Sequence, residues 1–184
     1  MRGWRARRSR GLNLACGPWA HVASSHWVNV DGFPDESWRM QPHVVADARH
    51  PLPFHDAAFD SAYLGHFLEH LSYEDEAQIV LGEVRRVLRP GGELVVVGPC
   101  IDKALATRQP DWLLERIRRG EPGPGLEHRW TPTTALTLAA VRQASFDAVR
   151  EVPVGKVRRP SWPNPNRDPW QCAVRAIRPG RDTD

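Results

Sequence analysis

Residues 72–97 read S-Y-E-D-E-A-Q-I-V-L-G-E-V-R-R-V-L-R-P-G-G-E-L-V-V-V, a helical pattern that leads directly into a strand. Ser72 can cap the start of the helix, and Asp75 follows three positions later. Apolar side chains then recur at helical spacing, at Ile79, Val80, Val84, Val87 and Leu88. Pro-Gly-Gly at 90–92 ends the helix, and the apolar run that follows predicts a buried strand over 93–97.

The same alternation of strand and helix continues on both sides of this unit. Short apolar runs predict four earlier strands at 11–15, 27–31, 43–47 and 59–64. After it, helices are expected at 111–119 and from a cap at Thr131 to about residue 145. Segments 148–153 and 170–177 predict a final hairpin around a long Pro-rich connection. We therefore expect an α/β fold, a single Rossmann-like domain with an open, doubly wound and mostly parallel sheet.

The composition supports a globular domain and excludes several other classes. The chain has 184 residues, of which 41% are hydrophobic and 26% charged, with a mean hydropathy of −0.50. Its longest clean apolar run, 94–97, is far shorter than the roughly 20 residues of a membrane span. Three scattered cysteines do not form a disulfide framework, and no apolar signal segment follows the basic start. These features predict a cytoplasmic protein without a membrane partner.

Charge is unevenly distributed along the chain. Residues 1–10 carry five arginines and no acid, whereas residues 31–83 carry eleven acids against two arginines. We interpret 1–10 as a basic flexible tail, 11–178 as the domain and 179–184 as a second tail. The alternative for the first tail is a nucleic-acid-binding arm, although nucleic acid is not the partner we expect. The sequence does not indicate an oligomeric state.

Three features should meet where the predicted parallel strands end. The turn Ala15-Cys16-Gly17 follows the first strand, Asp31 ends the second and Asp47 ends the third. In open α/β sheets a ligand binds in the crevice beyond the carboxyl ends of the strands. Gly17 would let a ligand approach the backbone closely, and Asp31 could accept both hydroxyls of a ribose. Fourteen positions from Gly17 to Asp31, against roughly 20 in dinucleotide fingerprints, argue against a nicotinamide cofactor.

The motifs, in this order, resemble those of class I S-adenosylmethionine-dependent methyltransferases, especially the small methyltransferase-11-like group. They are L-N-L-A-C-G, V-N-V-D, V-V-A-D-A-R-H-P-L-P-F-H-D-A-A-F-D, H-F-L-E-H-L and E-V-R-R-V-L-R-P-G-G-E-L-V-V-V-G-P, within residues 12–99, with a weaker match at 128–136. The resemblance implies S-adenosylmethionine as cofactor and a small-molecule methyl acceptor. It implies the following contacts: Ala15, Cys16 and Gly17 with the methionine part, Asp31 with the ribose, Asp47 and Ala48 with the adenine, and Leu64, Gly65 and His66 near the sulfonium.

Two departures from the family pattern leave other functions open. Ala15 stands where the family usually has glycine, and the first crossover is short. A cofactor-binding partner subunit without transferase activity is therefore one alternative, and a nucleic-acid-modifying protein that uses the arginine tail is another.

His66 and His70 are the expected catalytic residues, as a base or substrate contact after the fourth strand. With Glu69 they have i, i+3, i+4 spacing, so a metal site is an alternative that we rank below the base, and a structural role is a third. No metal is included among the expected cofactors. A lid over the acceptor could come from Trp112, Trp130 and Trp162 with His128 and Arg129, although aromatic residues more often pack in a core.

Overall fold

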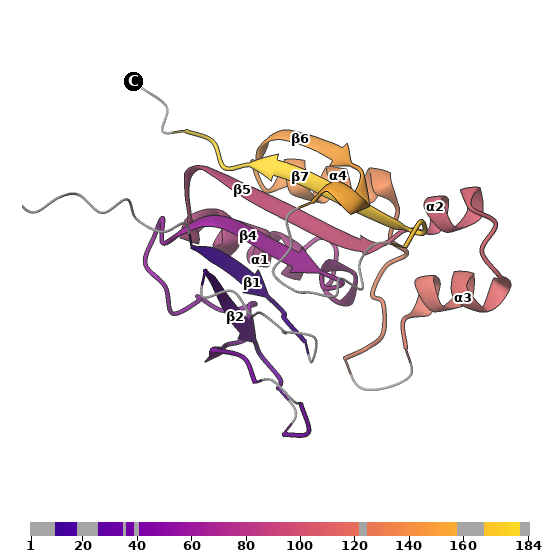
Figure 1. The fold of residues 1–184 in the computed structure, drawn as a ribbon, viewed down its shortest axis with the longest axis horizontal. Coiled ribbons are helices and arrows are strands. Elements are labelled where there is room, and N and C mark those ends of the chain that lie inside the picture. The colour runs from indigo at the N-terminus through magenta and orange to yellow at the C-terminus, as the bar shows by residue number, and fades with distance from the viewer. Residues whose placement is uncertain are drawn as a thin grey trace, which may run out of the picture.

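The computed structural model describes residues 10–17, 26–34, 36–38, 41–121, 125–157 and 168–180. Within them, one sheet has the strand order β3-β2-β1-β4-β5-β7-β6 (Figure 1). The strands are β1 (Gly11–Leu14), β2 (Trp27–Asp31), β3 (Val44–Val45), β4 (Phe59–Gly65), β5 (Leu88–Pro99), β6 (Asp147–Val152) and β7 (Gln171–Ile177). The helices are α1 (Glu76–Val87), α2 (Ile101–Ala106), α3 (Asp111–Arg119) and α4 (Thr134–Gln143), with 3-10 turns η1 (Leu68–His70) and η2 (Val154–Lys156).

The topology confirms the predicted fold class. β3, β2, β1, β4 and β5 are parallel neighbours, while β7 pairs antiparallel with both β5 and β6. The chain runs outward from β1 to β3 on one side and from β4 to β5 on the other. The order of the strands therefore reverses between β1 and β4, which makes their carboxyl ends the expected binding edge.

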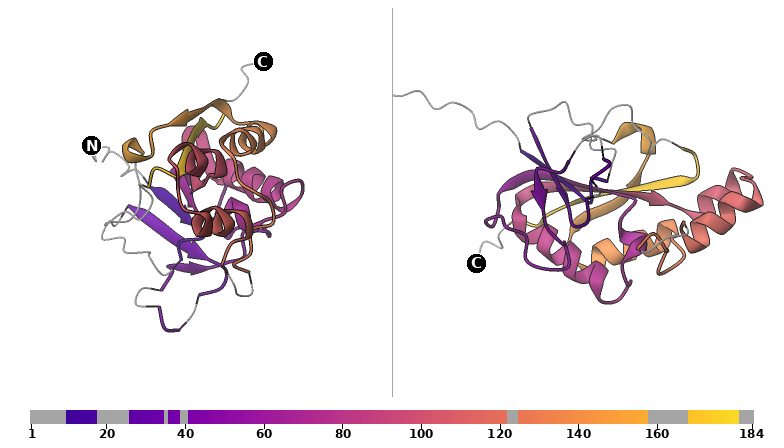
Figure 2. Two further views of the ribbon diagram at one scale, coloured as in Figure 1. Left: turned by 90° about the vertical axis from the view of Figure 1, so that its right-hand side faces the viewer. Right: turned by 90° about the horizontal axis from the view of Figure 1, so that it is seen from below.

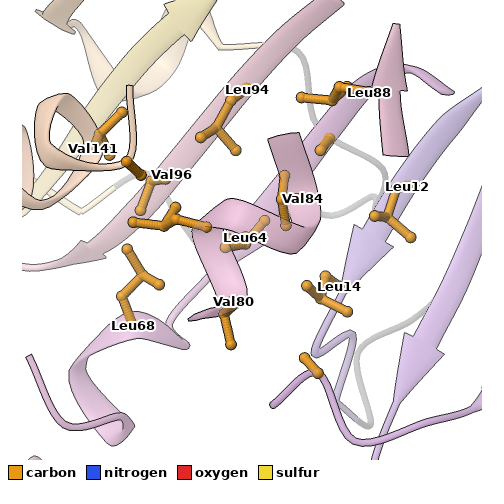
Figure 3. Close-up of a cluster of buried hydrophobic side chains, with 14 of the residues drawn as sticks. Leu12, Leu14, Leu64, Leu68, Val80, Val84, Leu88, Leu94, Val96 and Val141 are labelled. Carbon is orange, nitrogen blue, oxygen red and sulfur yellow. The ribbon is translucent and has the colours of Figure 1, made fainter. Parts of the chain in front are cut away.

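The main hydrophobic core lies between the sheet and the helices α1 and α4. Figure 2 shows both helices on one face of the sheet, and Figure 3 shows side chains of β1, β4 and β5 meeting Val80 and Val84 of α1 and Val141 of α4. A second, smaller cluster on the sheet contains Trp27, Tyr63, Val95, Val97 and Ala173. The helices α2 and α3 extend beyond the carboxyl end of β5 (Figure 1) and pack against each other through Ala104, Leu113 and Ile117.

The start of α1 shows a capping interaction one residue longer than expected. The Ser72 hydroxyl accepts a hydrogen bond from Glu76 N at 3.0 Å, and Ser72 N donates to Glu76 Oε2 at 2.8 Å. Glu76, rather than Asp75, is therefore the reciprocal partner of Ser72, one residue further along, and α1 begins at Glu76.

Other boundaries differ from the prediction for tertiary reasons. The helix α4 is capped by Thr133 and not by Thr131, with Thr133 Oγ1 accepting from Leu136 N at 3.0 Å. The residue after Thr131 contacts α2: the carbonyl of Pro132 accepts a hydrogen bond from Ile101 N, the first residue of α2, at 2.9 Å. The fifth strand starts at Leu88, before the predicted 93–97, because Leu88 pairs with Phe59. After an irregularity in the register, the pairing resumes between Ser61 and Glu93. The third strand shrinks to two residues, and α2 was not predicted.

The tails predicted on either side of the domain are described only in part. Arg10, assigned to the tail, directly precedes β1 and bonds to β4: its N donates to Asp60 Oδ2 at 2.7 Å, and Asp60 N donates to its carbonyl at 2.9 Å. Residues 1–9, 158–167 and 181–184 lie outside the described residues. These segments make up most of the two tails and of the Pro-rich connection. Among the residues that are described, no helix has the length and apolar character needed to cross a membrane.

Candidate functional site

A cavity of about 480 Å³ lies at the carboxyl ends of β1, β4 and β5. Its floor comes from the sheet, and its outer wall comes from α3 and the segments that flank it. Most of the lining residues are polar or aromatic, and they are Asn13, Ala15, Cys16, Tyr63, Gly65, His66, His70, Pro99, Trp112, Leu113, Arg116, Ile117, Gly120, Glu121, Leu126, His128, Asp168, Trp170 and Gln171. The structure thus brings Ala15, Cys16, Gly65, His66 and His70 of the predicted site together at one opening.

The turn after β1 has the backbone geometry of a ligand cradle. Ala15 and Gly17 both have positive φ, 53° and 58°, and a Cβ added at Gly17 would meet no atom of the described residues within 4 Å. The Asp31 carboxylate holds this turn: its Oδ2 accepts from Gly17 N at 2.9 Å and its Oδ1 from Phe33 N at 3.0 Å. Burial, reinforced by the Asp31 charge, raises the pKa of the Cys16 thiol to about 12, so this thiol is not a nucleophile at neutral pH.

Asp31 retains the capacity to bind a ligand while it supports the turn. A carboxylate offers about four lone-pair sites, and the two backbone donors use one on each oxygen. A ribose contact by Asp31 stays a prediction.

Asp47 is engaged by a neighbouring arginine. Arg49 Nε lies 3.0 Å from Asp47 Oδ1 and Arg49 Nη2 lies 2.7 Å from Oδ2, while Arg49 Nη1 reaches Glu76 at 3.3 Å. The hydrogen bond from the Arg49 side chain lowers the pKa of Asp47. Ala48 is buried beside it. Adenine contacts by these residues stay predictions, because neither borders the cavity.

Leu64 is not at the site. Its side chain is fully buried in the main core on the helix face of the sheet (Figure 3), so it cannot border the crevice. Side chains alternate along a strand, and the residues on either side of Leu64, Tyr63 and Gly65, border the cavity.

His66 occupies a strained backbone position with both ring nitrogens directed at protein groups. Its φ is 52°, in the left-handed region, which is energetically unfavourable for a residue with a Cβ. Residues in such conformations cluster at functional sites. Its Nε2 lies 2.9 Å from the Gln171 side-chain Nε2, and its Nδ1 lies 3.6 Å from Glu69 Oε1. Because the Gln171 amide nitrogen is a donor, this arrangement has His66 Nε2 accepting. A base at this position would have to exchange Gln171 for the acceptor.

Glu69 is a buried acid below the cavity. It is 3% exposed, and its Oε1 has no hydrogen-bond partner in the part of the chain that the structure describes. Burial raises the pKa of its carboxyl to about 8. The 3.6 Å separation from His66 is too long for a strong hydrogen bond, so this contact does not offset the desolvation.

His70 does not join His66 as expected but faces His128 on another segment. The two rings lie edge to face with centroids 4.9 Å apart. Burial lowers the pKa of both imidazoles, which favours their neutral forms near pH 7. The histidine that accompanies Glu69 and His70 in a compact group is therefore His128, whereas the spacing in the sequence had indicated His66.

The aromatic lid is only partly as expected. Trp112, 65% exposed, borders the cavity, as does His128. Trp130 does not: its Nε1 donates to the Leu68 carbonyl at 3.1 Å and its ring packs on Tyr73. Arg129 pairs with Glu76 at 3.7 Å, and Trp162 lies outside the described residues.

Sequence reasoning missed Trp170 and Gln171. Antiparallel pairing sets Gln171 opposite Pro99 at the end of β5, which carries both residues into the crevice.

Comparison of the sequence with known families agrees with this architecture. Residues 19–96 match the family model described as a methyltransferase domain. A stretch of 98 residues is 34% identical to the ubiquinone/menaquinone biosynthesis C-methyltransferase of Laribacter hongkongensis, covering 52% of this chain and 36% of that protein. A shorter stretch of 51 residues is 43% identical to an O-methyltransferase of Aspergillus sclerotiorum, covering 28% of this chain and 18% of that protein. The matches thus span well under half the length of these curated relatives.

Solved structures share the fold over nearly the whole chain. A SAM-dependent methyltransferase from Archaeoglobus fulgidus superposes with a TM-score of 0.63 at 15% identity, covering 92% of this chain and 86% of that one. A possible histamine N-methyltransferase from Thermotoga maritima gives a TM-score of 0.61 at 17% identity, covering 94% and 84%. The strand order and these superpositions show that this chain has the fold of the solved S-adenosylmethionine-dependent methyltransferases, and its residues 19–96 are similar to the methyltransferase-domain family.

Proposed function

We propose that this protein transfers a methyl group from S-adenosylmethionine to a small-molecule acceptor. The observation that carries the proposal is the open turn at Gly17, which continues directly into the cavity through Ala15 and Cys16. A cofactor held at this turn would present one end to the same cavity that an acceptor can enter.

The residues at the turn fit the cofactor. Within the described part of the chain, no atom lies where a Cβ at Gly17 would be, which suits close approach of a ligand to the backbone. The Asp31 carboxylate is fixed beside it by two backbone hydrogen bonds. Gly17 and Cys16 would hold the amino-acid part and Asp31 the ribose, while Asp47 and Ala48 would meet the adenine. When bound, S-adenosylmethionine supplies an electrophilic methyl group on a cationic sulfonium.

The chain's own contribution is to align the acceptor and keep water out. Alignment of two reactants can contribute about 7–11 kcal/mol to lowering a barrier. The aromatic rings of Tyr63, Trp112 and Trp170 give the cavity flat apolar walls, and His66 and Arg116 provide polar groups among them. His66 could remove a proton from an acidic acceptor once Gln171 is displaced from its Nε2.

The dimensions of the cavity favour a small acceptor. Its volume of about 480 Å³ falls within the range of small-molecule sites, about 300–1,000 Å³. The aromatic walls suit a flat or ring-containing molecule. We also propose a cytoplasmic location and no role for nucleic acid in the reaction.

Transfer of a labelled methyl group tests this function. The full chain is incubated with S-adenosylmethionine carrying a labelled methyl group and a cell extract separated into small molecules, protein and nucleic acid. We expect label in the small-molecule fraction. Label only in nucleic acid or protein would overturn the small-molecule acceptor. Cofactor binding without label in any fraction would identify the partner subunit that lacks transferase activity.

A further inference from the structure

Three metal-ligating side chains converge at the wall of the cavity. One carboxylate oxygen of Glu69 and one ring nitrogen each of His70 and His128 lie within 4.8 Å of one another. Glu69 and His70 belong to η1, while His128 comes from the segment after α3, 58 residues further along the chain. Both histidines border the cavity, so the group combines a buried carboxylate with two accessible imidazoles.

The Nδ1 atoms of both histidines are already within hydrogen-bond distance of backbone carbonyls. His70 Nδ1 lies 3.1 Å from the Glu127 carbonyl, and His128 Nδ1 lies 2.7 Å from the Ile117 carbonyl. A carbonyl can only accept, so each Nδ1 carries the proton and each Nε2 keeps its lone pair. Metal-binding histidines characteristically donate their other nitrogen in this way, which fixes the tautomer and the orientation of the ring.

Hydrogen bonds hold the two segments in register. Trp130 Nε1 donates to the Leu68 carbonyl at 3.1 Å and Arg129 N donates to the Glu69 carbonyl at 2.8 Å. His128 N donates to the Arg119 carbonyl at 2.9 Å, which ties the same segment to α3. These hydrogen bonds therefore hold together the two segments that carry the three side chains.

The buried carboxylate provides a second observation that points to a ligand. Glu69 is 3% exposed, and no described residue forms a hydrogen bond with its Oε1. Buried polar atoms are nearly always satisfied, and an oxygen left without a partner calls for an explanation such as an ion.

We propose that Glu69, His70 and His128 bind one divalent ion of the Zn²⁺ type at the wall of the cavity. Two imidazole nitrogens and a carboxylate oxygen form a ligand set that suits Zn²⁺ and leaves a fourth position open. Ligand atoms around tetrahedral zinc lie about 3.4 Å apart, so binding requires the longest separation to close by about 1 Å or somewhat more. The open position would face the cavity and could hold an oxygen atom of the acceptor. That role rests on the proposed function, whereas the binding of metal does not.

Metal titration without cofactor or acceptor tests the site. The full chain, freed of any histidine tag and treated with a chelator, is titrated with Zn²⁺ by calorimetry and with Co²⁺ by visible absorption. We expect one equivalent of each metal to bind, with the absorption of a four- or five-coordinate Co²⁺ complex. A wild-type chain that binds neither metal at micromolar concentrations would overturn the proposal, whatever its transferase activity.

Single substitutions identify the ligands. Loss of an outer-shell partner typically weakens metal binding about 10–100-fold, so Glu69→Gln, His70→Ala and His128→Ala should each weaken Zn²⁺ binding by about 100-fold or more. His55→Ala changes an exposed histidine outside the group and should bind Zn²⁺ like the wild type. His66→Gln should also retain stoichiometric metal. Loss of binding in His66→Gln with retention in His128→Ala would replace the proposed site with the set based on sequence spacing.

Thermal unfolding covers the case in which a ligand variant is unstable. Zn²⁺ should raise the Tm of the wild type and of His55→Ala, because a ligand that binds only the native state stabilises it. It should leave the Tm of His70→Asn and His128→Asn unchanged, whatever their starting values. An equal Zn²⁺-induced rise in those two variants would contradict the assignment.

Discussion

Replacing Ala15 with glycine should stabilise the protein, because this residue adopts a backbone conformation that favours glycine. Its φ is 53°, and a non-glycine residue in the left-handed region costs roughly 1–2 kcal/mol. Glycine also stabilises the unfolded chain by about 0.4–1 kcal/mol, because it increases the conformational entropy of that state, and this offsets part of the gain. The free energy of unfolding should therefore rise by about 0.5–1 kcal/mol, which corresponds to a Tm increase of about 1–4 °C in a chain of this size.

Urea unfolding followed by circular dichroism measures the change, and the chain offers matched controls. Ala57 has a φ of 57° in an exposed turn outside the cavity, so Ala57→Gly should give a similar gain in stability. Gly17→Ala should show the opposite sign, a loss of about 1 kcal/mol, because its φ of 58° is positive while its Cβ would meet no atom of the described residues. A loss of stability in Ala15→Gly alongside a gain in Ala57→Gly would refute the strained turn after β1.

Three further predictions concern the site and the core. Asp31→Ala should weaken the binding of S-adenosylmethionine by about 1.5–3 kcal/mol, the value for hydrogen bonds to a charged group, and an unchanged Kd in calorimetry would contradict the ribose contact. Glu83→Gln should cost about 1–3 kcal/mol of unfolding free energy at pH 7. The Arg86 side chain lowers the pKa of the Glu83 carboxyl below its ordinary 4.5, so that stabilisation is complete above pH 4.5 and is lost as the pH falls through the lowered value. A difference from the wild type that persists unchanged at pH 3 would therefore contradict the ion pair. His66→Gln should slow methyl transfer by about 10²–10⁴-fold with little effect on cofactor affinity if His66 is the base, and wild-type turnover would exclude that role.

The architecture could be predicted because its strands carry their own pattern. The segments 27–31 and 59–64 became β2 and β4 with little change, since each is an apolar run bounded by turn residues. The helix cap at residue 131 failed for a reason that lies elsewhere in the chain. Thr131 followed by Pro132 is a good local start, but Pro132 accepts a hydrogen bond from α2, and Asp102 of α2 accepts from Thr134 N at 3.1 Å. These tertiary contacts move the start of α4 by two residues.

The same distinction applies to the site. The turn at Gly17 could be predicted because a glycine after the first strand of such a sheet has few roles. The meeting of His70 with His128 could not, because no local spacing connects residues so far apart. Similarly, only the antiparallel pairing of β7 with β5 brings Gln171 to His66. Local pattern thus predicted the turn after β1 better than the facing wall of the cavity, which long-range contacts assemble.

A calorimetric titration of the full chain with S-adenosylhomocysteine tests the central claim most directly, because it measures occupancy of the crevice without requiring the acceptor. We expect one binding site per chain and at least tenfold weaker binding in Gly17→Leu, whose side chain would enter space that no described residue occupies. Gly155→Leu, placed in equally open space on η2 away from the crevice, should bind like the wild type. No binding by the folded wild-type chain, or equal binding by Gly17→Leu, would contradict the assignment of this crevice to the cofactor.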